Sequence, residues 1–266
     1  MNREILADIQ SQQPAQAIAI DRVGVNGLCF PLRLRDKARG IQTVTAQAAL
    51  AVDLPAQARG THMSRFVEVL DAWQEELGCQ SMRRLLEELK ARLHASRAWA
   101  DFHFLYLVRK QAPAGGAGAD MAYKCSVSAW LAERLSFTLG LEVPVMTVCP
   151  CSLAISRQGA HSQRALVKME IQINSFVWLE EFIGIAEQAG SSPVYPLLKR
   201  EDEKFVTESA FARPAFVEDV ARSAAALLAA HPQVEAYSVA VESMESIHNH
   251  NAFACIASAQ MQTLRH

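Results

Sequence analysis

The alternation of apolar and polar residues divides the chain into segments typical of strands and helices. A period of two, typical of strands that bury one face, runs through residues 23–36 and 42–53. Apolar residues then recur at helical spacing in residues 64–73 and 82–93, and Ser81 is predicted to be the N-cap of the second helix. The first part of the chain is therefore predicted to be two strands followed by two helices.

The same order of strands and helices returns in the rest of the chain. Alternation resumes in residues 98–109, 121–130 and 135–148, and the Ala- and Gly-rich residues 112–119 predict a flexible hairpin connection. Further along we expect a strand, two helices and two strands, in that order, over residues 165–173, 179–189, 215–229, 234–241 and 252–260. Runs of strands separated by pairs of helices predict an α+β fold, in which an antiparallel sheet carries its helices on one face.

Length and composition limit the class of protein. The chain has 266 residues, of which 50% are hydrophobic, enough for a sizeable core. The polar residues 1–20 are predicted to form a mobile arm rather than a signal peptide, and no apolar run is long enough to cross a membrane. We therefore expect a cytoplasmic protein without a membrane partner. Six cysteines without a framework pattern indicate reduced thiols rather than disulfides.

The charge balance and two missing motifs narrow the function. A formal net charge of -2 gives no general attraction to nucleic acid, so we expect no nucleic-acid partner. Neither GxGxxG nor GxxxxGK[ST] occurs, so neither a dinucleotide fingerprint nor a P-loop explains the activity. An anionic ligand would have to be held by a local cluster of cations.

The strongest candidate for chemistry is the segment of residues 149–161, in which two thiols and an imidazole follow a predicted strand. Thiolate and imidazole bind zinc and similar divalent ions, and a catalytic site needs three protein ligands and an open position. Cys149 and His161 are predicted to supply two of the three ligands. Pro150 stiffens the turn between the thiols, and Gly159 allows the chain to bend before the imidazole. The alternative is that the cysteines are ordinary buried core residues.

Two helix starts carry candidate binding groups. His62 and Arg65 stand where the first predicted helix begins, a place that favours an anion such as phosphate. The alternative is that Thr61 or Ser64 merely caps this helix. Glu218 also stands at a helix start, where the helix dipole alone explains a carboxylate. A planar carboxylate can, however, also pair with the N–H and exocyclic amine of a guanine-like ring.

Two polar segments add carboxylates and imidazoles. Residues 242–251 lie between the last two predicted strands and contain Glu245 and His248, a pair able to transfer protons near neutral pH. The alternative is an exposed polar loop. The charge run of residues 197–204 is typical of a solvated surface. Within it, Glu203 is a candidate for the missing third metal ligand, because carboxylates are common ligands in catalytic sites.

Together these segments resemble the signature blocks of the type IB GTP cyclohydrolases. The blocks occur in the expected order and cover nearly the whole chain after the N-terminal arm. They are Gly60-Thr-His-Met-Ser-Arg-Phe-Val-Glu68, Cys149-Pro-Cys-Ser…Gly-Ala-His161, Leu197-Leu-Lys-Arg-Glu-Asp-Glu203, Phe216-Val-Glu-Asp219 and Glu242-Ser-Met-Glu-Ser-Ile-His-Asn-His250. The resemblance implies the tunnelling fold, with two tandem units of antiparallel sheet and paired helices over residues 21–133 and 134–266. It also implies a homo-oligomer, usually a homotetramer.

The resemblance further implies an activity, the conversion of GTP and water to 7,8-dihydroneopterin triphosphate and formate, which begins folate-type pterin synthesis. By position, Cys149, His161 and Glu203 would bind a divalent metal, which is zinc, manganese or ferrous iron, with Cys151 as a neighbouring thiol. Water activated by the metal would attack C8 of the guanine. The other implied roles are proton transfer by Glu245 and His248, binding of the purine edge by Glu218, and binding of the triphosphate by Lys199, Arg200, His62 and Arg65.

Two other interpretations stay open. The same fold also suits a related pterin or deazapurine enzyme, such as a nitrile reductase or a pterin synthase. A protein that stores or senses metal would keep the ligands without the reaction. The Glu245–His248 pair argues against storage, because storage requires no proton transfer.

Overall fold

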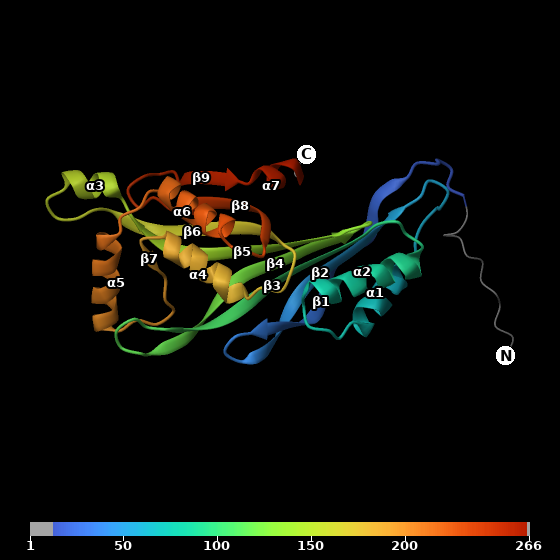
Figure 1. Ribbon diagram of the computed structural model, residues 1–266, viewed down its shortest axis with the longest axis horizontal. Helices are drawn as coiled ribbons and strands as arrows, with labels where there is room; N and C mark the ends of the chain where they lie inside the picture. The colour runs from blue at the N-terminus through green and yellow to red at the C-terminus, as the bar shows by residue number, and fades with distance from the viewer. Residues whose placement is uncertain (1–12, 265–266) are drawn as a thin grey trace. The chain divides into compact units, whose positions relative to one another are not determined.

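The computed structural model of the protein describes residues 13–264 (Figure 1). Most of the predicted arm, residues 1–20, lies outside the described residues. The chain forms two compact units. The first extends to His103 and includes Val127–Phe137, and the second consists of Phe104–Ser126 together with the chain from Thr138 onward. The predicted boundary between residues 133 and 134 falls in the short connection that follows Leu131.

In the first unit, a long hairpin pairs with the start of a third strand. Strand β1 (Ile20–Asp36) runs antiparallel to β2 (Gly40–Leu54), and β2 pairs with the first residues of β3 (Ala98–Gln111). Helices α1 (Met63–Ala72) and α2 (Cys79–Leu93) lie beside each other against β1 and β2 (Figure 1). The core of this unit includes the buried side chains of Leu32, Leu50, Phe66, Leu86 and Phe102.

The second unit is built on a run of antiparallel strands. Strand β5 (Leu135–Val148) pairs with β6 (Ser162–Ile173), β6 pairs with β8 (Val234–Ser243), and β8 pairs with β9 (Ala252–Ala257). The two-residue strand β7 (Ser192–Pro193) pairs with the end of β5. With β4 (Gly118–Leu131), the hydrogen-bonded order of the sheet is β1-β2-β3-β4-β5-β6-β8-β9, and β7 lies off this path.

Helices cover one face of the strands in the second unit. Helices α4 and α6 pack against each other, and α6 packs on β8 and β9 (Figure 1). The helices of this unit are α3 (Pro150–Ile155), α4 (Leu179–Ala189), α5 (Arg200–Ala212), α6 (Val217–Ala229) and α7 (Ala259–Leu264).

The buried face of these strands follows from their period of two. Val167, Met169 and Ile171 of β6 are each at most 1% exposed, and the residues between them point to the other face. Phe182 of α4 and Leu228 of α6 are fully buried in the layer of helices. Each large apolar side chain buried in this way stabilises the fold by about 1.5–3 kcal/mol.

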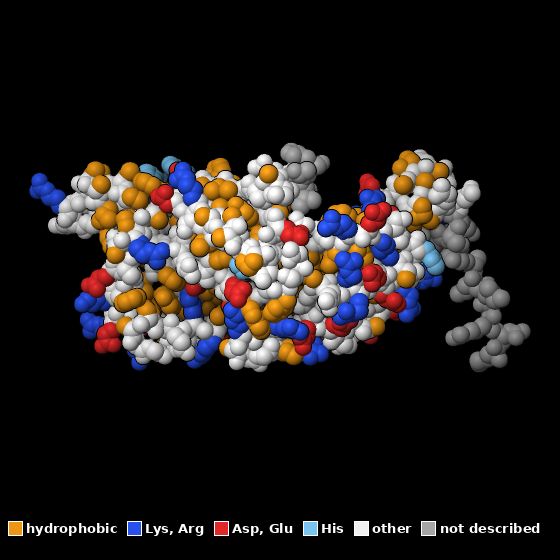
Figure 2. All heavy atoms as spheres, in the orientation of Figure 1, with side chains coloured by type: hydrophobic (Ala, Val, Ile, Leu, Met, Phe, Trp, Pro, Cys, Tyr) orange, Lys and Arg blue, Asp and Glu red, His pale blue; other side chains and the backbone are white. Residues whose placement is uncertain are grey.

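This arrangement confirms the predicted α+β fold. Every strand and helix expected from the pattern is present, with ends that differ by a few residues. The charge run predicted to lie at the surface leads into α5, and acidic and basic side chains appear on the outer side of that helix, at the left of Figure 2. Asp202 is the exception to this prediction, because its side chain is fully buried. No helix among residues 13–264 is long and apolar enough to cross a membrane.

Two local predictions were wrong. Helix α2 begins at Cys79 with Gly78 as its N-cap, so Ser81 lies inside the helix, and its hydroxyl donates back to the carbonyls of Glu76 and Gly78. The last strand does not reach residue 260, because β9 ends at Ala257 and α7 begins two residues later. Both errors concern the ends of elements, which periodicity locates only to within a few residues.

A buried polar cluster lies in the second unit between β3, β4 and α4. Lys110 Nζ lies 2.6 Å from Glu187 Oε1, and these side chains are 12% and 15% exposed. The same carboxylate oxygen accepts the Tyr123 hydroxyl at 2.8 Å, and the ammonium also lies 4.4 Å from the centre of the Tyr195 ring. Burial lowers the pKa of Lys110, an effect that Glu187 partly offsets, and burial raises the pKa of Tyr123. The cluster therefore holds a charged pair away from water.

The burial of β4 predicts the reactivity of one cysteine. Cys125 is 4% exposed, and burial raises the pKa of its thiol to about 12. Because the thiolate is the nucleophile, we expect iodoacetamide at pH 8 to leave Cys125 unmodified in the native protein and to modify the exposed Cys29 and Cys151. Peptide mass spectrometry measures the labelling of each thiol, and Cys125 should react only in denaturant. Native labelling of Cys125 as fast as that of Cys29 would contradict this burial.

Candidate functional site

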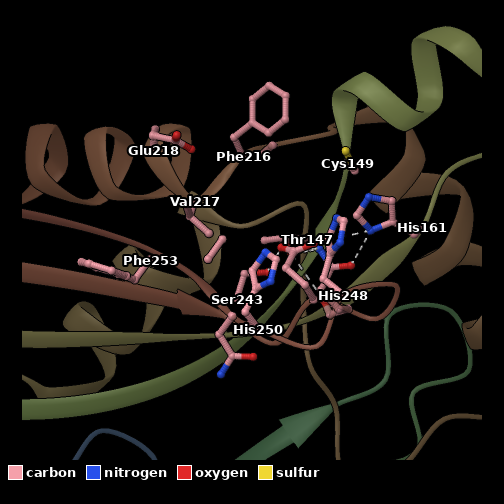
Figure 3. Close-up of a pocket in the computed structure, with 15 residues that line it drawn as sticks. Thr147, Cys149, His161, Phe216, Val217, Glu218, Ser243, His248, His250 and Phe253 are labelled. Atoms are coloured by element: carbon pink, nitrogen blue, oxygen red, sulfur yellow. Dashed lines mark hydrogen bonds and ion pairs between the residues drawn. The ribbon is translucent and has the colours of Figure 1, made fainter.

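The loop after β5 brings a thiol and an imidazole together. Cys149 is the N-cap of α3, and its Sγ accepts the Ser152 N–H at 3.4 Å. The Cys149 N–H donates to the His161 carbonyl at 3.1 Å, and the His161 N–H donates to the Ser152 hydroxyl at 3.4 Å. These bonds close residues 149–161 into a loop, and Figure 3 shows Cys149 and His161 next to each other at the base of α3.

The loop requires a glycine before the imidazole. Gly159 has φ +118°, a conformation that L side chains rarely adopt. A Cβ atom at this position would also lie 3.3 Å from the ring of Phe211. The backbone conformation and the close approach of Phe211 therefore both favour glycine, as the sequence predicted for the bend.

The His161 ring is held by a polar network. Its Nδ1 lies 2.9 Å from Gln163 Oε1, and Gln163 Nε2 donates to Thr147 Oγ1 at 3.2 Å and to Glu245 Oε1 at 3.3 Å. Ser243 donates to the same Glu245 oxygen at 2.8 Å. With the amide oxygen facing the ring, Nδ1 carries the proton and Nε2 keeps its lone pair. The network therefore presents an imidazole ready to accept a proton or bind a metal.

Glu245 lies close to this imidazole and largely away from solvent. Its Oε2 is 3.7 Å from His161 Nδ1, and the two side chains are 13% and 12% exposed. The His248 ring meets the His161 ring edge-on, with centroids 6.4 Å apart, and the His250 ring stacks on His248 with centroids 5.0 Å apart. The segment between β8 and β9 is thus not only an exposed polar loop, because it contributes a carboxylate and two imidazoles to the cavity that Cys149 and His161 also line.

Glu218 faces the same space from helix α6. Asp219 accepts the Phe216 N–H at 3.1 Å, so Asp219 satisfies the first turn of the helix. Glu218 is exposed and lines the cavity across from the Cys149 loop (Figure 3). Its carboxylate is therefore available to a ligand.

These groups line one open cavity of about 520 Å³, within the size range of small-molecule sites. The cavity brings together five of the residues predicted from the sequence. They are Cys149, His161, Glu218, Glu245 and His248. Cys149 is only partly buried and Cys151 is exposed, so neither is the core cysteine of the alternative interpretation.

The other predicted site residues lie elsewhere. Lys199, Arg200 and Glu203 are exposed at the start of α5 and do not line the cavity. Residues 62 and 65 belong to the first unit, where His62 is the N-cap of α1 and Arg65 donates to the Arg92 carbonyl at 3.0 Å. Neither Thr61 nor Ser64 is that N-cap, so the alternative prediction, in which one of them caps the helix, was wrong.

Three site residues were missed by the sequence analysis. Thr147, Gln163 and Ser243 each stand near the end of a strand, in phase with the buried apolar residues of that strand. Thr147 and Ser243 are at most 2% exposed. A polar residue on the apolar face of a strand is a signal that could have identified them, because burying it requires a hydrogen-bond partner.

The comparisons with known proteins identify the family of this chain. A family model described as type I GTP cyclohydrolase folE2 matches residues 6–254. A GTP cyclohydrolase FolE2 from Nitratidesulfovibrio vulgaris (strain DSM 19637 / Miyazaki F) is 58% identical over 252 residues, which cover 94% of this chain and 97% of that protein. A GTP cyclohydrolase FolE2 from Geobacter sulfurreducens is 44% identical over 94% of this chain and 97% of its own length.

The chain belongs to the FolE2 family of type I GTP cyclohydrolases. Solved structures agree with the fold expected for it. A uricase from Arthrobacter globiformis has a TM-score of 0.52 with 7% identity, over 89% of this chain and 92% of the uricase. A urate oxidase from Bacillus sp. TB-90 has a TM-score of 0.54 with 7% identity, over 90% of this chain and 99% of that chain. At such identity the likeness concerns the fold alone, and it confirms the predicted tunnelling fold.

The Cys149–His161 pair of this FolE2-family chain suits a divalent metal. Both donors lie on the cavity wall, and the hydrogen bond of Nδ1 to Gln163 leaves Nε2 as the metal-binding nitrogen. Metal-binding histidines usually make such a bond through their second nitrogen. Residues 13–264 contain no group of three His, Cys, Asp or Glu side chains placed to bind a metal. The pair therefore fits a metal ion but needs a further donor.

We expect Gln163→Leu to lower the affinity for zinc about 10- to 100-fold, because the ring of His161 loses the partner that orients it. Competition with a chelator measures this affinity. Gln158→Leu, an exposed change in the same loop, is the matched control and should leave the affinity unchanged. Wild-type affinity in a folded Gln163→Leu variant would show that the amide does not orient the ligand.

Proposed function

We propose that this protein is a metal-dependent GTP cyclohydrolase I of the IB type. It converts GTP and water to 7,8-dihydroneopterin triphosphate and formate, the first step of folate-type pterin synthesis. The observation that carries the proposal is the single cavity that gathers a thiol–imidazole pair, the Glu245 network and the Glu218 carboxylate. The names of relatives that are 44–58% identical over nearly the whole chain support it.

Glu218 binds the purine. Its two oxygens accept hydrogen bonds from the N1–H and the exocyclic amine of guanine, a planar bidentate contact. The position of this carboxylate across the cavity from Cys149 and His161 leaves the imidazole side of the purine directed at the pair. The site thereby distinguishes guanine from adenine, whose N1 carries no proton.

Cys149 and His161 would hold the metal, and Glu203, which does not line the cavity of its own chain, would supply the third donor from a neighbouring copy. A mixed thiolate, imidazole and carboxylate set suits zinc, manganese or ferrous iron. When bound, the metal supplies a Lewis acid and lowers the pKa of a water molecule toward neutrality, as attack at C8 requires. The hydrogen bond to Gln163 fixes the orientation of the His161 ring and would leave its Nε2 free for the metal.

Glu245 and His248 move protons. The attacking water must lose a proton, and the ring nitrogens must gain protons as the imidazole ring opens and formate leaves. Glu245 Oε2 lies 3.7 Å from His161 Nδ1 and the carboxylate is held by Ser243 and Gln163, so it is fixed beside the imidazole. His248 lines the cavity and is exposed, so in this proposal it exchanges protons with solvent.

Lys199, Arg200, His62 and Arg65 bind the triphosphate. The first two lie at the N-terminal end of α5, where backbone N–H groups also favour an anion. None of the four lines the cavity. We propose that they act from neighbouring copies in a homo-oligomer, a homotetramer. We propose the cytoplasm as its location.

The alternatives are weaker. A related pterin or deazapurine enzyme on the same fold would not be expected to have relatives of this identity named GTP cyclohydrolase over 94% of the chain. A metal-storage protein would not need the hydrogen-bonded carboxylate that Gln163 and Ser243 hold beside His161.

The direct test is to strip the protein of metal and add zinc, manganese or ferrous iron back separately. We expect formate and a fluorescent pterin from GTP with at least one of the three ions and none without metal. A folded, metal-binding protein that yields neither product with any ion would refute the proposed reaction.

Cys149→Ala should abolish formate release, at least 100-fold below wild type, because removal of a metal ligand eliminates the Lewis acid. The matched control is Cys255→Ala, an exposed thiol on β9 that does not line the cavity. Circular dichroism checks that both variants fold. Full turnover by Cys149→Ala would disprove the assigned metal chemistry.

Glu218→Gln tests recognition of guanine. Loss of a charged acceptor costs about 1.5–3 kcal/mol, which lowers kcat/KM for GTP roughly 10- to 150-fold. Zinc affinity should not change, because Glu218 is not a metal ligand. Glu235→Gln, an exposed change outside the cavity, is the control. An unchanged kcat/KM for GTP in Glu218→Gln would assign purine binding to another residue.

A further inference from the structure

The connection from β7 to α5, residues 194–199, belongs to no helix or strand. It leads to Lys199 and Arg200, the two residues at the start of α5 that are proposed to bind the triphosphate. A segment of this kind lacks the repeating backbone hydrogen bonds that fix a helix or a sheet, so its path depends on individual contacts. The contacts of this connection therefore decide where the two cations lie.

Lys110, near the end of β3, makes two of these contacts. Its ammonium donates to the Val194 carbonyl and lies 4.4 Å from the centre of the Tyr195 ring. The same ammonium lies 2.6 Å from Oε1 of Glu187 in α4. One side chain thus joins the first residues of the connection to a strand and to a helix.

A second contact holds the far end of the connection. Asp202, which is fully buried in the first turn of α5, accepts the Lys199 N–H at 2.9 Å. Its other oxygen accepts the N–H groups of Ala114 at 2.8 Å and Gly115 at 2.7 Å, in the turn between β3 and β4. Both ends of the connection are therefore held against the same hairpin, one by Lys110 and the other by the hairpin turn.

Stability alone does not explain the buried pair of Lys110 and Glu187. The two side chains are 12% and 15% exposed, so both charges have lost most of their hydration. Apolar residues of similar volume in place of such a pair often leave a protein equally stable or more stable. An apolar side chain could not, however, donate to the Val194 carbonyl. The pair is therefore better explained by the position that it gives to the connection.

We propose that Lys110 is a positioning residue for the binding of the triphosphate. Through the Val194 carbonyl it sets the path of the connection, and with it the positions of Lys199 and Arg200. Glu187 directs the ammonium, and Lys110 itself does not line the cavity. The inference rests on the proposed function, which assigns the two cations at the start of α5 to the phosphates.

The double variant Lys110→Met/Glu187→Gln tests the inference. It removes both charges and the donor to Val194, while an amide at position 187 can still accept the Tyr123 hydroxyl. Because no buried charge is left unpaired, we expect a urea midpoint close to that of wild type. The KM for GTP should rise about 10-fold with kcat within about twofold, because the cations are misplaced and the reacting groups are not. Hydrogen–deuterium exchange should become faster in residues 194–199.

Two controls separate position from general damage. Glu187→Gln alone keeps the donation from Lys110 to Val194 and should keep the wild-type KM for GTP. Guanosine carries no phosphate, so its inhibition constant against GTP should be the same in the double variant and in wild type. An equal loss of affinity for guanosine and GTP would show a distorted purine site and would contradict the inference.

A folded double variant with the wild-type KM for GTP would overturn the inference, because the pair would then serve stability alone. If the double variant does not fold, Tyr195→Leu and Tyr195→Phe decide instead. Both keep the buried pair, and only Tyr195→Phe keeps an aromatic ring against the ammonium. We expect Tyr195→Leu to raise the KM for GTP about threefold and Tyr195→Phe to leave it unchanged. Equal KM values in these two variants would disprove the positioning role.

Hydrogen exchange separates this inference from the proposed function, because it requires no substrate. Wild-type protein that yields no product from GTP would refute the proposed reaction, and the exchange of residues 194–199 would still report whether Lys110 fixes the connection. Exchange that is equally slow in wild type and in the folded double variant would refute the inference, whatever the reaction.

Discussion

The hydrogen bond from the Cys149 N–H to the His161 carbonyl is the contact on which the rest of the site depends. It joins the end of β5 to the start of β6 across a loop of eleven intervening residues, and so brings the thiol and the imidazole together. The β5–β6 pairing continues from it without a break, beginning at Val148 and Ser162. The paired strands therefore hold the thiol and the imidazole in defined positions. A site placed on strand ends in this way is better defined than one placed on a free loop.

The second constraint is the burial of polar side chains at the same strand ends. Thr147, Gln163 and Ser243 occupy positions that the period of two would give to apolar residues. An apolar residue at each position would stabilise the core more. The hydrogen bonds that the three polar residues make instead fix the positions of Glu245 and His161. Such networks are worth their desolvation only when every member finds a partner. The network therefore lowers local stability, and it orients the Glu245 carboxylate and the His161 ring.

The first turn of helix α5 carries two neighbouring carboxylates in different environments. Its buried Asp202 belongs to the packing of the β3–β4 turn, while the neighbouring Glu203 faces outward. Adjacent carboxylates in one acidic run thus have opposite environments, one satisfied by three backbone N–H groups and the other exposed. Asp202 fixes the first turn of α5, and the same turn carries Glu203. The buried carboxylate therefore sets the position of the exposed one.

The sequence by itself determined the elements and the chemistry of the donors. Periodicity located the strands and helices, since each buries one face at a fixed spacing, and the residue types of Cys149, His161, Glu218 and Glu245 limited the reactions they support. Only the tertiary structure decided which polar residues act together. Gln163 joined the site because it lies next to His161 at the start of β6 and bonds its ring, whereas α5 places Glu203 at the surface, off the cavity that Cys149 and His161 line. Periodicity describes one segment at a time, whereas these placements depend on contacts between segments far apart in the chain.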